Sequence, residues 1–184
     1  GTVTQLTLIP DLNLGIVVLT NQQQGVAFNT ITNTVKDAYL GIEDRNWLKT
    51  YAERYAKGNA QYDQEKAETY AKVAAYQKDR SAKLAPEQFV GTYRDAWFGD
   101  VVISKEKKGF RVICKSSERL KGEVLPYSRD TFVIKWDDRS YDADAFFTLT
   151  FDENGKAVSA KMKPISDVTD FSFDFGDLDL KKVD

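Results

Sequence analysis

Two clusters of aspartates are the groups in this sequence with the most evident chemistry. Carboxylate oxygens are the ligands that calcium and magnesium prefer. Neither cluster has the Asp-x-Asp-x-Asp-Gly spacing of a calcium loop, and alternate residues of a strand place their carboxylates on one solvated face. Spacing alone also does not show two carboxyl groups facing one cleft, as glycoside hydrolysis requires. We therefore predict no metal site and no cofactor at Asp137, Asp138, Asp142 and Asp144, or at Asp170, Asp174, Asp177 and Asp179.

The 184 residues include no histidine, which excludes several kinds of active site. A serine or cysteine nucleophile would have no imidazole to activate it, and the commonest zinc ligand is missing. The single cysteine, Cys114, follows Val112 and Ile113, and we predict that it is a small buried thiol. We expect no enzymatic activity from this chain itself.

Aromatic residues offer a different chemistry, because their flat faces pack against ligands and other proteins. Trp97 and Phe98 fall in a predicted loop, Asp95–Gly99. Loops lie at the surface, so large apolar side chains in them indicate a contact with a ligand, another protein or the core. They either line the mouth of a site, cover a neighbouring domain or subunit, or pack locally. The candidate ligand or interface residues are Tyr93, Trp97, Phe98 and Trp136.

Composition and charge narrow the range of partners. A hydrophobic content of 42% and a charged content of 29% are ordinary for a globular protein. The net charge of −2 and the pI near 5.4 give no reason to expect nucleic acid or an anionic membrane as a partner. We also predict no membrane span, because no stretch approaches the roughly 20 apolar residues that one needs.

The elements that position these residues fall into three segments, of which the first is residues 1–43. Thr2–Ile9 and the apolar run Gly15–Thr20 are predicted to be two strands joined by a tight turn. Helical spacing of apolar residues predicts a helix over Val26–Leu40, and Gly41 is placed to end it.

Residues 44–85 are predicted to be a helical connector, because they are rich in alanine, lysine, glutamate and glutamine. Asp44 is placed as an N-cap, and Pro86 prevents continuation. Gly58-Asn59 marks the point where we expect the helix to kink or break. A stripe of aromatic residues at multiples of seven predicts packing against a domain or a partner helix. Its members are Tyr55, Tyr62 and Tyr76.

Residues 86–184 are predicted to be all β. Short alternating runs are separated by turn signals such as Asp152–Gly155, which predicts an up-and-down antiparallel meander. Closing the meander into a barrel would remove its free edges. The predicted strands are Phe89–Arg94, Asp100–Lys105, Phe110–Lys115, Leu120–Tyr127, Thr131–Trp136, Phe146–Phe151, Ala157–Lys163, Phe171–Phe175 and Leu178–Val183.

Two parts of the chain resemble known families. Residues 8–21 and 39–41 resemble the C-terminal end of the penicillin-binding, class C β-lactamase-like serine hydrolase domain, where this stretch forms the last strands of the central sheet and the closing helix. Residues 86–184 resemble the domain of unknown function DUF3471, often fused behind such hydrolases. The pieces that carry the second resemblance are Phe89–Asp100, Asp142–Phe146 and Thr169–Phe175.

The resemblance to the hydrolases implies a catalytic apparatus that this chain lacks. That family acylates a serine in a Ser-x-x-Lys motif on a helix, with a Tyr-x-Asn motif and a Lys-Thr-Gly or His-x-Gly strand. The last three motifs do not occur here. The string Ser104–Lys107 fits the first, but it lies where a predicted strand runs into a turn, and we interpret it as chance. In the parent protein the catalytic motifs would lie upstream of Thr2.

Together with the sequence patterns, the resemblance indicates an α+β chain: a truncated hairpin plus helix (1–43), a long helical connector (44–85) and an antiparallel, up-and-down, lipocalin-like barrel (86–184). It implies a non-catalytic accessory region that shapes or caps the parent's active site or mediates assembly. The implied partners are the missing upstream hydrolase domain and a second copy of the chain, in a periplasmic or other extracytoplasmic location.

An alternative is a lipocalin-like barrel that binds a small molecule in its own right. An open cavity lined by phenylalanine and tryptophan would favour that alternative. Inward side chains that fill the barrel would favour a structural role.

The apolar residues of the first segment also need cover, because burying each such side chain is worth roughly 1.5–3 kcal/mol. We expect the segment to fold back on the connector or to pair with another copy. The residues concerned are Leu6, Leu8, Ile16, Val18 and Phe28.

Overall fold

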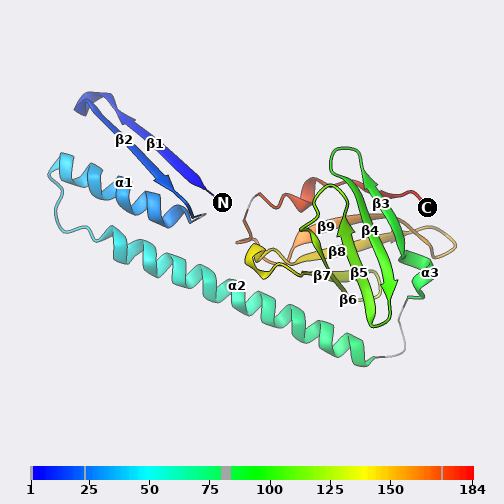
Figure 1. Ribbon diagram of the computed structural model, residues 1–184. Helices are drawn as coiled ribbons and strands as arrows, with labels where there is room; N and C mark the ends of the chain where they lie inside the picture. Colours follow the sequence, from blue (N-terminus) through cyan, green and yellow to red (C-terminus); the bar gives the residue numbers. More distant parts are fainter. Residues whose placement is uncertain (1, 23, 80–83, 171) are drawn as a thin grey trace. The chain divides into compact units, whose positions relative to one another are not determined.

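The computed structural model describes residues 2–22, 24–79, 84–170 and 172–184 (Figure 1). The chain forms two compact units, Gly1–Tyr62 and Asp63–Asp184, each with its own sheet. The predicted α+β class is confirmed, because a two-stranded sheet and helices precede a closed antiparallel barrel of eight strands. Among the described residues, no helix is both long and apolar enough to cross a membrane.

The first unit contains a hairpin and a helix, in the predicted order. Strands β1 (Val3–Ile9) and β2 (Leu14–Thr20) pair antiparallel around a short 3₁₀ turn, which ends at Asn13 with a left-handed φ of 45°. Helix α1 (Gly25–Leu40) ends at Gly41, whose φ of 63° is the left-handed conformation that glycine adopts at little cost.

One face of the hairpin packs on α1. The side chain of Gln5 accepts a 2.5 Å hydrogen bond from the Thr32 hydroxyl and donates one of 3.3 Å to Asn29, both of which belong to α1. Ile16 and Val18 lie on this same face and are buried. Their predicted burial is therefore confirmed, and the cover is the helix of their own segment.

The other face of the hairpin remains uncovered in the described chain. Leu6, Leu8, Val17 and Leu19 are 63%, 67%, 61% and 74% exposed, and Leu6 pairs directly with Val17 across the two strands. Since alternate residues of a strand point to opposite faces, one helix covers only half of the apolar side chains. The connector therefore does not cover Leu6 and Leu8, and the other expected cover, a second copy of the chain, stays a prediction. We call these four residues the hairpin outer face.

Helix α2 (Trp47–Lys78) is continuous over 32 residues. The predicted break at Gly58-Asn59 is wrong, because the flanking residues are good helix formers and outweigh the cost of about 1 kcal/mol for one glycine. The predicted N-cap is also wrong. Asp44 has a left-handed φ of 63° and lies before the helix, and the side chain of Asn46 accepts the N–H of Lys49 instead.

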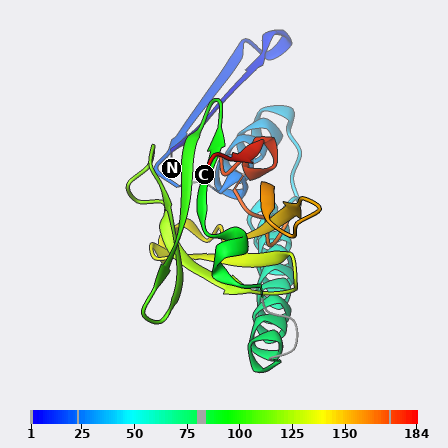
Figure 2. The same cartoon turned by 90° about the vertical axis from the view of Figure 1, so that its right-hand side faces the viewer.

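The second unit is a closed barrel with the strand order β10-β3-β4-β5-β6-β7-β8-β9 (Figures 1 and 2). Every strand pairs antiparallel with its neighbours in sequence, so the predicted up-and-down connectivity is confirmed. A short helix, α3 (Pro86–Phe89), precedes the first strand. The strands are β3 (Gly91–Asp95), β4 (Gly99–Glu106), β5 (Gly109–Cys114), β6 (Lys121–Pro126), β7 (Thr131–Trp136), β8 (Ala145–Phe151), β9 (Ala157–Pro164) and β10 (Leu180–Lys182).

Two predicted strand segments differ in the structure. Phe89 belongs to α3 instead of the first strand, because Pro86 at the start of α3 favours a helical turn. The predicted strand Phe171–Phe175 is wrong from Ser172 onward: this stretch is a turn that leads into a 3₁₀ helix at Phe175–Asp177, while Phe171 lies outside the described residues. The stretch buries Phe175 without joining the sheet.

Inward side chains fill the barrel and extend to both of its ends. One continuous core contains fully buried residues from the strands, among them Tyr93, Trp136 and Phe147. At one end Phe89 of α3 contacts the rings of Phe110 and Phe132, which lie near the starts of β5 and β7. At the other end Phe175 stacks on Trp136 with ring centres 5.9 Å apart. The barrel is therefore built as a packed core.

Candidate functional site

The four aromatic candidates do not form one site. Tyr93 and Trp136 are both buried in the barrel core. The Tyr93 hydroxyl donates a 2.6 Å hydrogen bond to the carbonyl of Phe89, and the Trp136 indole N–H donates one of 2.7 Å to the carbonyl of Ala143. Each polar atom thus has a partner inside the fold, as buried tyrosine and tryptophan require.

Trp97 and Phe98 lie in the tight turn between β3 and β4, as the sequence predicts. Trp97 is 84% exposed, whereas Phe98 packs against the core. The Asp95 carboxylate accepts the N–H groups of Trp97 and Phe98 at 2.8 Å, and that of Asp179 at 2.8 Å. The N–H of Phe98 is the largest of the causes that hold the pKa of Asp95 below its usual range. The turn is therefore fixed by its own aspartate, and it presents Trp97 to solvent.

A buried polar group with several hydrogen-bond partners is Asp144, in the segment between β7 and β8. Its side chain is only 1% exposed. Arg139 donates two hydrogen bonds to it, of 2.6 and 2.7 Å, and the N–H of Trp136 donates a third of 3.2 Å. A buried carboxylate is stable only when it is paired and hydrogen-bonded, and this geometry meets both conditions.

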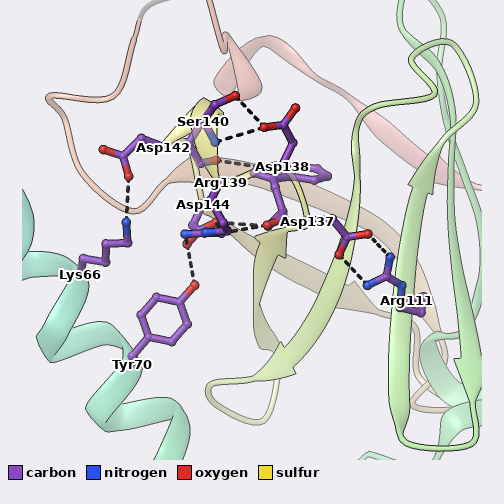
Figure 3. A network of polar contacts seen from close by, with 11 residues as sticks. Lys66, Tyr70, Arg111, Asp137, Asp138, Arg139, Ser140, Asp142 and Asp144 are labelled. Carbon is purple, nitrogen blue, oxygen red and sulfur yellow. Dashed lines mark hydrogen bonds and ion pairs between the residues drawn. The ribbon is translucent and has the colours of Figure 1, made fainter.

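Helix α2 supplies two further partners of this network (Figure 3). The Tyr70 hydroxyl donates a 2.5 Å hydrogen bond to Asp144, and the Lys66 ammonium lies 2.8 Å from the Asp142 carboxylate. Burial, followed by the hydrogen bond to Asp144, raises the pKa of Tyr70, so that the phenol stays protonated and remains a donor. The end of α2 that belongs to the second unit is thereby bonded to the loop before β8. We call these contacts the helix–barrel latch.

Sequence reasoning missed the helix–barrel latch. From the sequence, Asp142 and Asp144 are considered only as metal ligands, and Tyr70 only as a neighbour of the aromatic stripe that Tyr55, Tyr62 and Tyr76 form. Lys66 lies 76 residues before Asp142, and Tyr70 lies 74 residues before Asp144. No local sequence pattern links residues so far apart. One usable signal is that Asp144 immediately precedes Ala145, the first residue of the buried strand β8. A carboxylate in such a place is expected to have bonding partners inside the fold.

The other aspartates of the first cluster are also held by arginines and by their own loop. Arg111 pairs with Asp137 through two hydrogen bonds, and Arg119 pairs with Asp138. Hydrogen bonds from Ser140, followed by the one from Arg119, lower the pKa of Asp138 to about 2. Among the described residues, no three acidic, cysteine or histidine side chains come together as a metal site would require.

Ser104, Lys107 and Cys114 have no catalytic arrangement in the described structure. Ser104 lies in β4 opposite Arg111, and Lys107 lies in the following turn, so the pair lacks the helical geometry of a Ser-x-x-Lys motif. Burial raises the pKa of the Cys114 thiol to about 12, which keeps it protonated and unreactive at neutral pH.

Comparison with known families agrees with the geometry of the second unit. The sequence profile described as "Domain of unknown function (DUF3471)" matches residues 75–182, which is more than half of the 184 residues. The chain belongs to the DUF3471 family. No curated protein and no solved structure matches it.

The DUF3471 match covers the complete barrel and the last turn of α2. It includes Asp142, Asp144 and Arg139, and it begins after Lys66 and Tyr70. The compact unit begins earlier, at Asp63. The α2 residues of the helix–barrel latch therefore belong to the structural unit of this DUF3471 protein, although they precede the matched region.

Proposed function

We propose that this DUF3471 chain is a non-catalytic accessory region of a β-lactamase-related serine hydrolase. In this proposal residues 1–43 complete the sheet of the hydrolase domain, and the barrel shapes or caps its active site or mediates assembly. The hairpin outer face is the observation that carries the proposal. The resemblance of residues 1–43 to β-lactamase-like hydrolases also leads us to propose a periplasmic or other extracytoplasmic location.

The hairpin outer face needs a partner for three physical reasons. Its four members are exposed aliphatic side chains on adjacent strands. Strands β1 and β2 contain no charged residue, so neither edge carries the lysines that usually prevent edge-to-edge pairing. A two-stranded sheet by itself is marginally stable in water, and α1 covers only one of its two faces. Further strands and a covering layer would satisfy all three requirements.

The packed barrel supports an accessory role over the alternative of a ligand held inside it. The inward side chains of the strands form one continuous buried cluster. A barrel of this size either fills its interior with side chains or encloses a ligand, and here side chains occupy it. We therefore expect the barrel to act through its outer surface and its ends.

The experiment compares the hydrolase that contains this chain with a version lacking residues 86–184. Hydrolysis of ester, amide and β-lactam substrates and the oligomeric state are measured for both. We expect altered selectivity, rate or assembly in the shortened protein. Unchanged rates, selectivity and assembly would overturn the accessory role.

A second experiment tests the hairpin outer face alone. In the hydrolase that contains this chain, the double substitution Leu6→Lys and Val17→Lys would place two charges in the proposed sheet contact. We expect insoluble or inactive enzyme. The single substitution Ala38→Lys, at an exposed position of α1, is the control and should be tolerated. Full activity of the double variant would contradict the proposed sheet contact.

A further inference from the structure

A hollow lies at the end of the barrel beside α3, and neither the proposed function nor the family match accounts for it. A narrow pocket of about 60 Å³ adjoins a wider one of about 390 Å³, and the two share Leu84 and Arg129. Sites for small molecules are commonly hollows of about 300–1,000 Å³ at such barrel ends. The residues that matter here are the aromatic floor of the narrow pocket and the charged groups at the rim.

Three phenylalanines form the floor of the narrow pocket. Phe89 stacks on Phe132 with ring centres 4.6 Å apart, and it meets Phe110 edge-on at 4.8 Å. Phe89 and Phe132 are buried, so the floor is part of the packed core and is preformed. A flat or branched apolar group fits against such a surface, since it buries area without requiring the floor to reorganise.

Within the part of the chain that the structure describes, some charged side chains at the rim of the hollow have hydrogen bonds, and others have none. Asp130 accepts hydrogen bonds from Ser128 and Thr131, and the Asp152 carboxylate accepts the N–H groups of the turn that follows it. Arg129 and Glu153 are exposed, and among the described residues no hydrogen bond or ion pair holds either side chain, although the charge of Arg129 helps to lower the pKa of its neighbour Asp130. One cation and one anion are therefore available to a ligand in the same hollow.

We propose that this hollow binds a small zwitterion with one apolar side chain, the chemistry of a free aromatic amino acid. The apolar side chain lies on the floor of Phe89, Phe110 and Phe132. The ligand carboxylate pairs with the Arg129 guanidinium, which presents parallel donors to a carboxylate. The ligand ammonium lies toward Glu153. A ligand with a carboxylate alone is disfavoured by the neighbouring aspartates, which are ionised at neutral pH.

The test is calorimetric titration of the full chain with three matched probes. L-phenylalanine carries both charges, phenethylamine carries only the ammonium, and 3-phenylpropionate carries only the carboxylate. We expect L-phenylalanine to bind about tenfold more tightly than either singly charged probe, which corresponds to one charge-assisted contact. Equal or tighter binding of a singly charged probe, or no binding of any probe, would overturn the proposal.

Two variants assign the contacts. Arg129→Gln and Glu153→Gln are exposed substitutions in turns and should leave the fold unchanged, which circular dichroism checks. Each should weaken L-phenylalanine about tenfold, while Lys107→Gln, in a different turn, should not. Unaltered affinity in Arg129→Gln would overturn the assignment. This site does not depend on an upstream hydrolase domain, so either proposal can fail while the other stands.

Discussion

The Tyr70 hydroxyl donates a 2.5 Å hydrogen bond to the buried carboxylate of Asp144, which Arg139 also holds through two hydrogen bonds. Tyr70 lies on α2 and Asp144 lies just before β8, 74 residues later. A local helix and a distant loop are thereby joined by one charged hydrogen-bond centre. The barrel unit of this protein consequently includes the second part of α2.

Replacing Tyr70 by phenylalanine tests the hydrogen bond across this contact. We expect Tyr70→Phe to lower the free energy of unfolding of the barrel by about 1.5 kcal/mol, because a donor to a charged acceptor is lost without a change of shape. Urea unfolding followed by Trp136 fluorescence, in a background of Trp47→Phe and Trp97→Phe, measures the change. Tyr55→Phe, at a more exposed position of α2, is the control, and an equal effect there would contradict the role of Tyr70.

Removing the Asp144 carboxylate should lower the free energy of unfolding more than removing the Tyr70 hydroxyl does. We expect Asp144→Ala to destabilise the barrel by about 3 kcal/mol, because the guanidinium of Arg139 and two further donors lose their buried acceptor. Asp142→Asn removes the charge of the more exposed ion pair with Lys66 and keeps a residue that tolerates the left-handed φ of 47°, so it should cost less than about 1 kcal/mol. Urea unfolding of both variants gives the comparison. Equal costs would show that Asp144 has no special position in the network.

A fall in pH should reduce the stability that Asp138, in the loop after β7, contributes to the folded protein. The pKa of Asp138 is about 2 in the folded protein, below its ordinary value of about 3.9. Ionised Asp138 therefore contributes stability above about pH 4, and the contribution is lost as the pH falls toward 2. The difference in unfolding free energy between the native protein and Asp138→Asn should shrink over this range. An NMR titration should show a higher pKa of Asp138 in Ser140→Ala, and an unchanged value would contradict the assigned cause.

The thiol of Cys114 should resist labelling in the folded state. Burial raises its pKa to about 12, and the side chain is enclosed in the barrel core. Reaction with an aromatic disulfide reagent at pH 8 should be more than about a hundredfold slower in the native protein than in urea, because both thiolate and access are lacking. Rapid labelling of the folded chain would indicate that the barrel opens at β5.

The order of the elements could be predicted from the sequence because each depends on local periodicity. The hairpin, α1 and the up-and-down connectivity of the barrel follow from alternation and turn signals. The errors arose where two local signals competed. Gly58 suggested a break that its helix-forming neighbours overrode, and the alternating Ser172–Phe175 stretch forms a turn that buries Phe175 against Trp136.

The candidate site was predicted only in part. The loop position of Trp97 follows from the turn signal that ends at Gly99, and its exposure follows from the turn that Asp95 holds. Tyr93 and Trp136 could not be separated from ligand-facing residues by pattern, because a filled barrel and a ligand-binding barrel have the same alternation. Only the packed interior distinguishes them.

The sequence by itself determined the class of the fold, the absence of histidine chemistry and the buried state of Cys114, because these depend on composition and on neighbours along the chain. The tertiary structure alone decided which carboxylate is buried, which leucines of the hairpin remain exposed, and that Arg129 and Glu153 share a hollow. These properties arise from contacts between residues far apart in sequence, and the energy of such contacts depends on burial and distance that no local pattern contains.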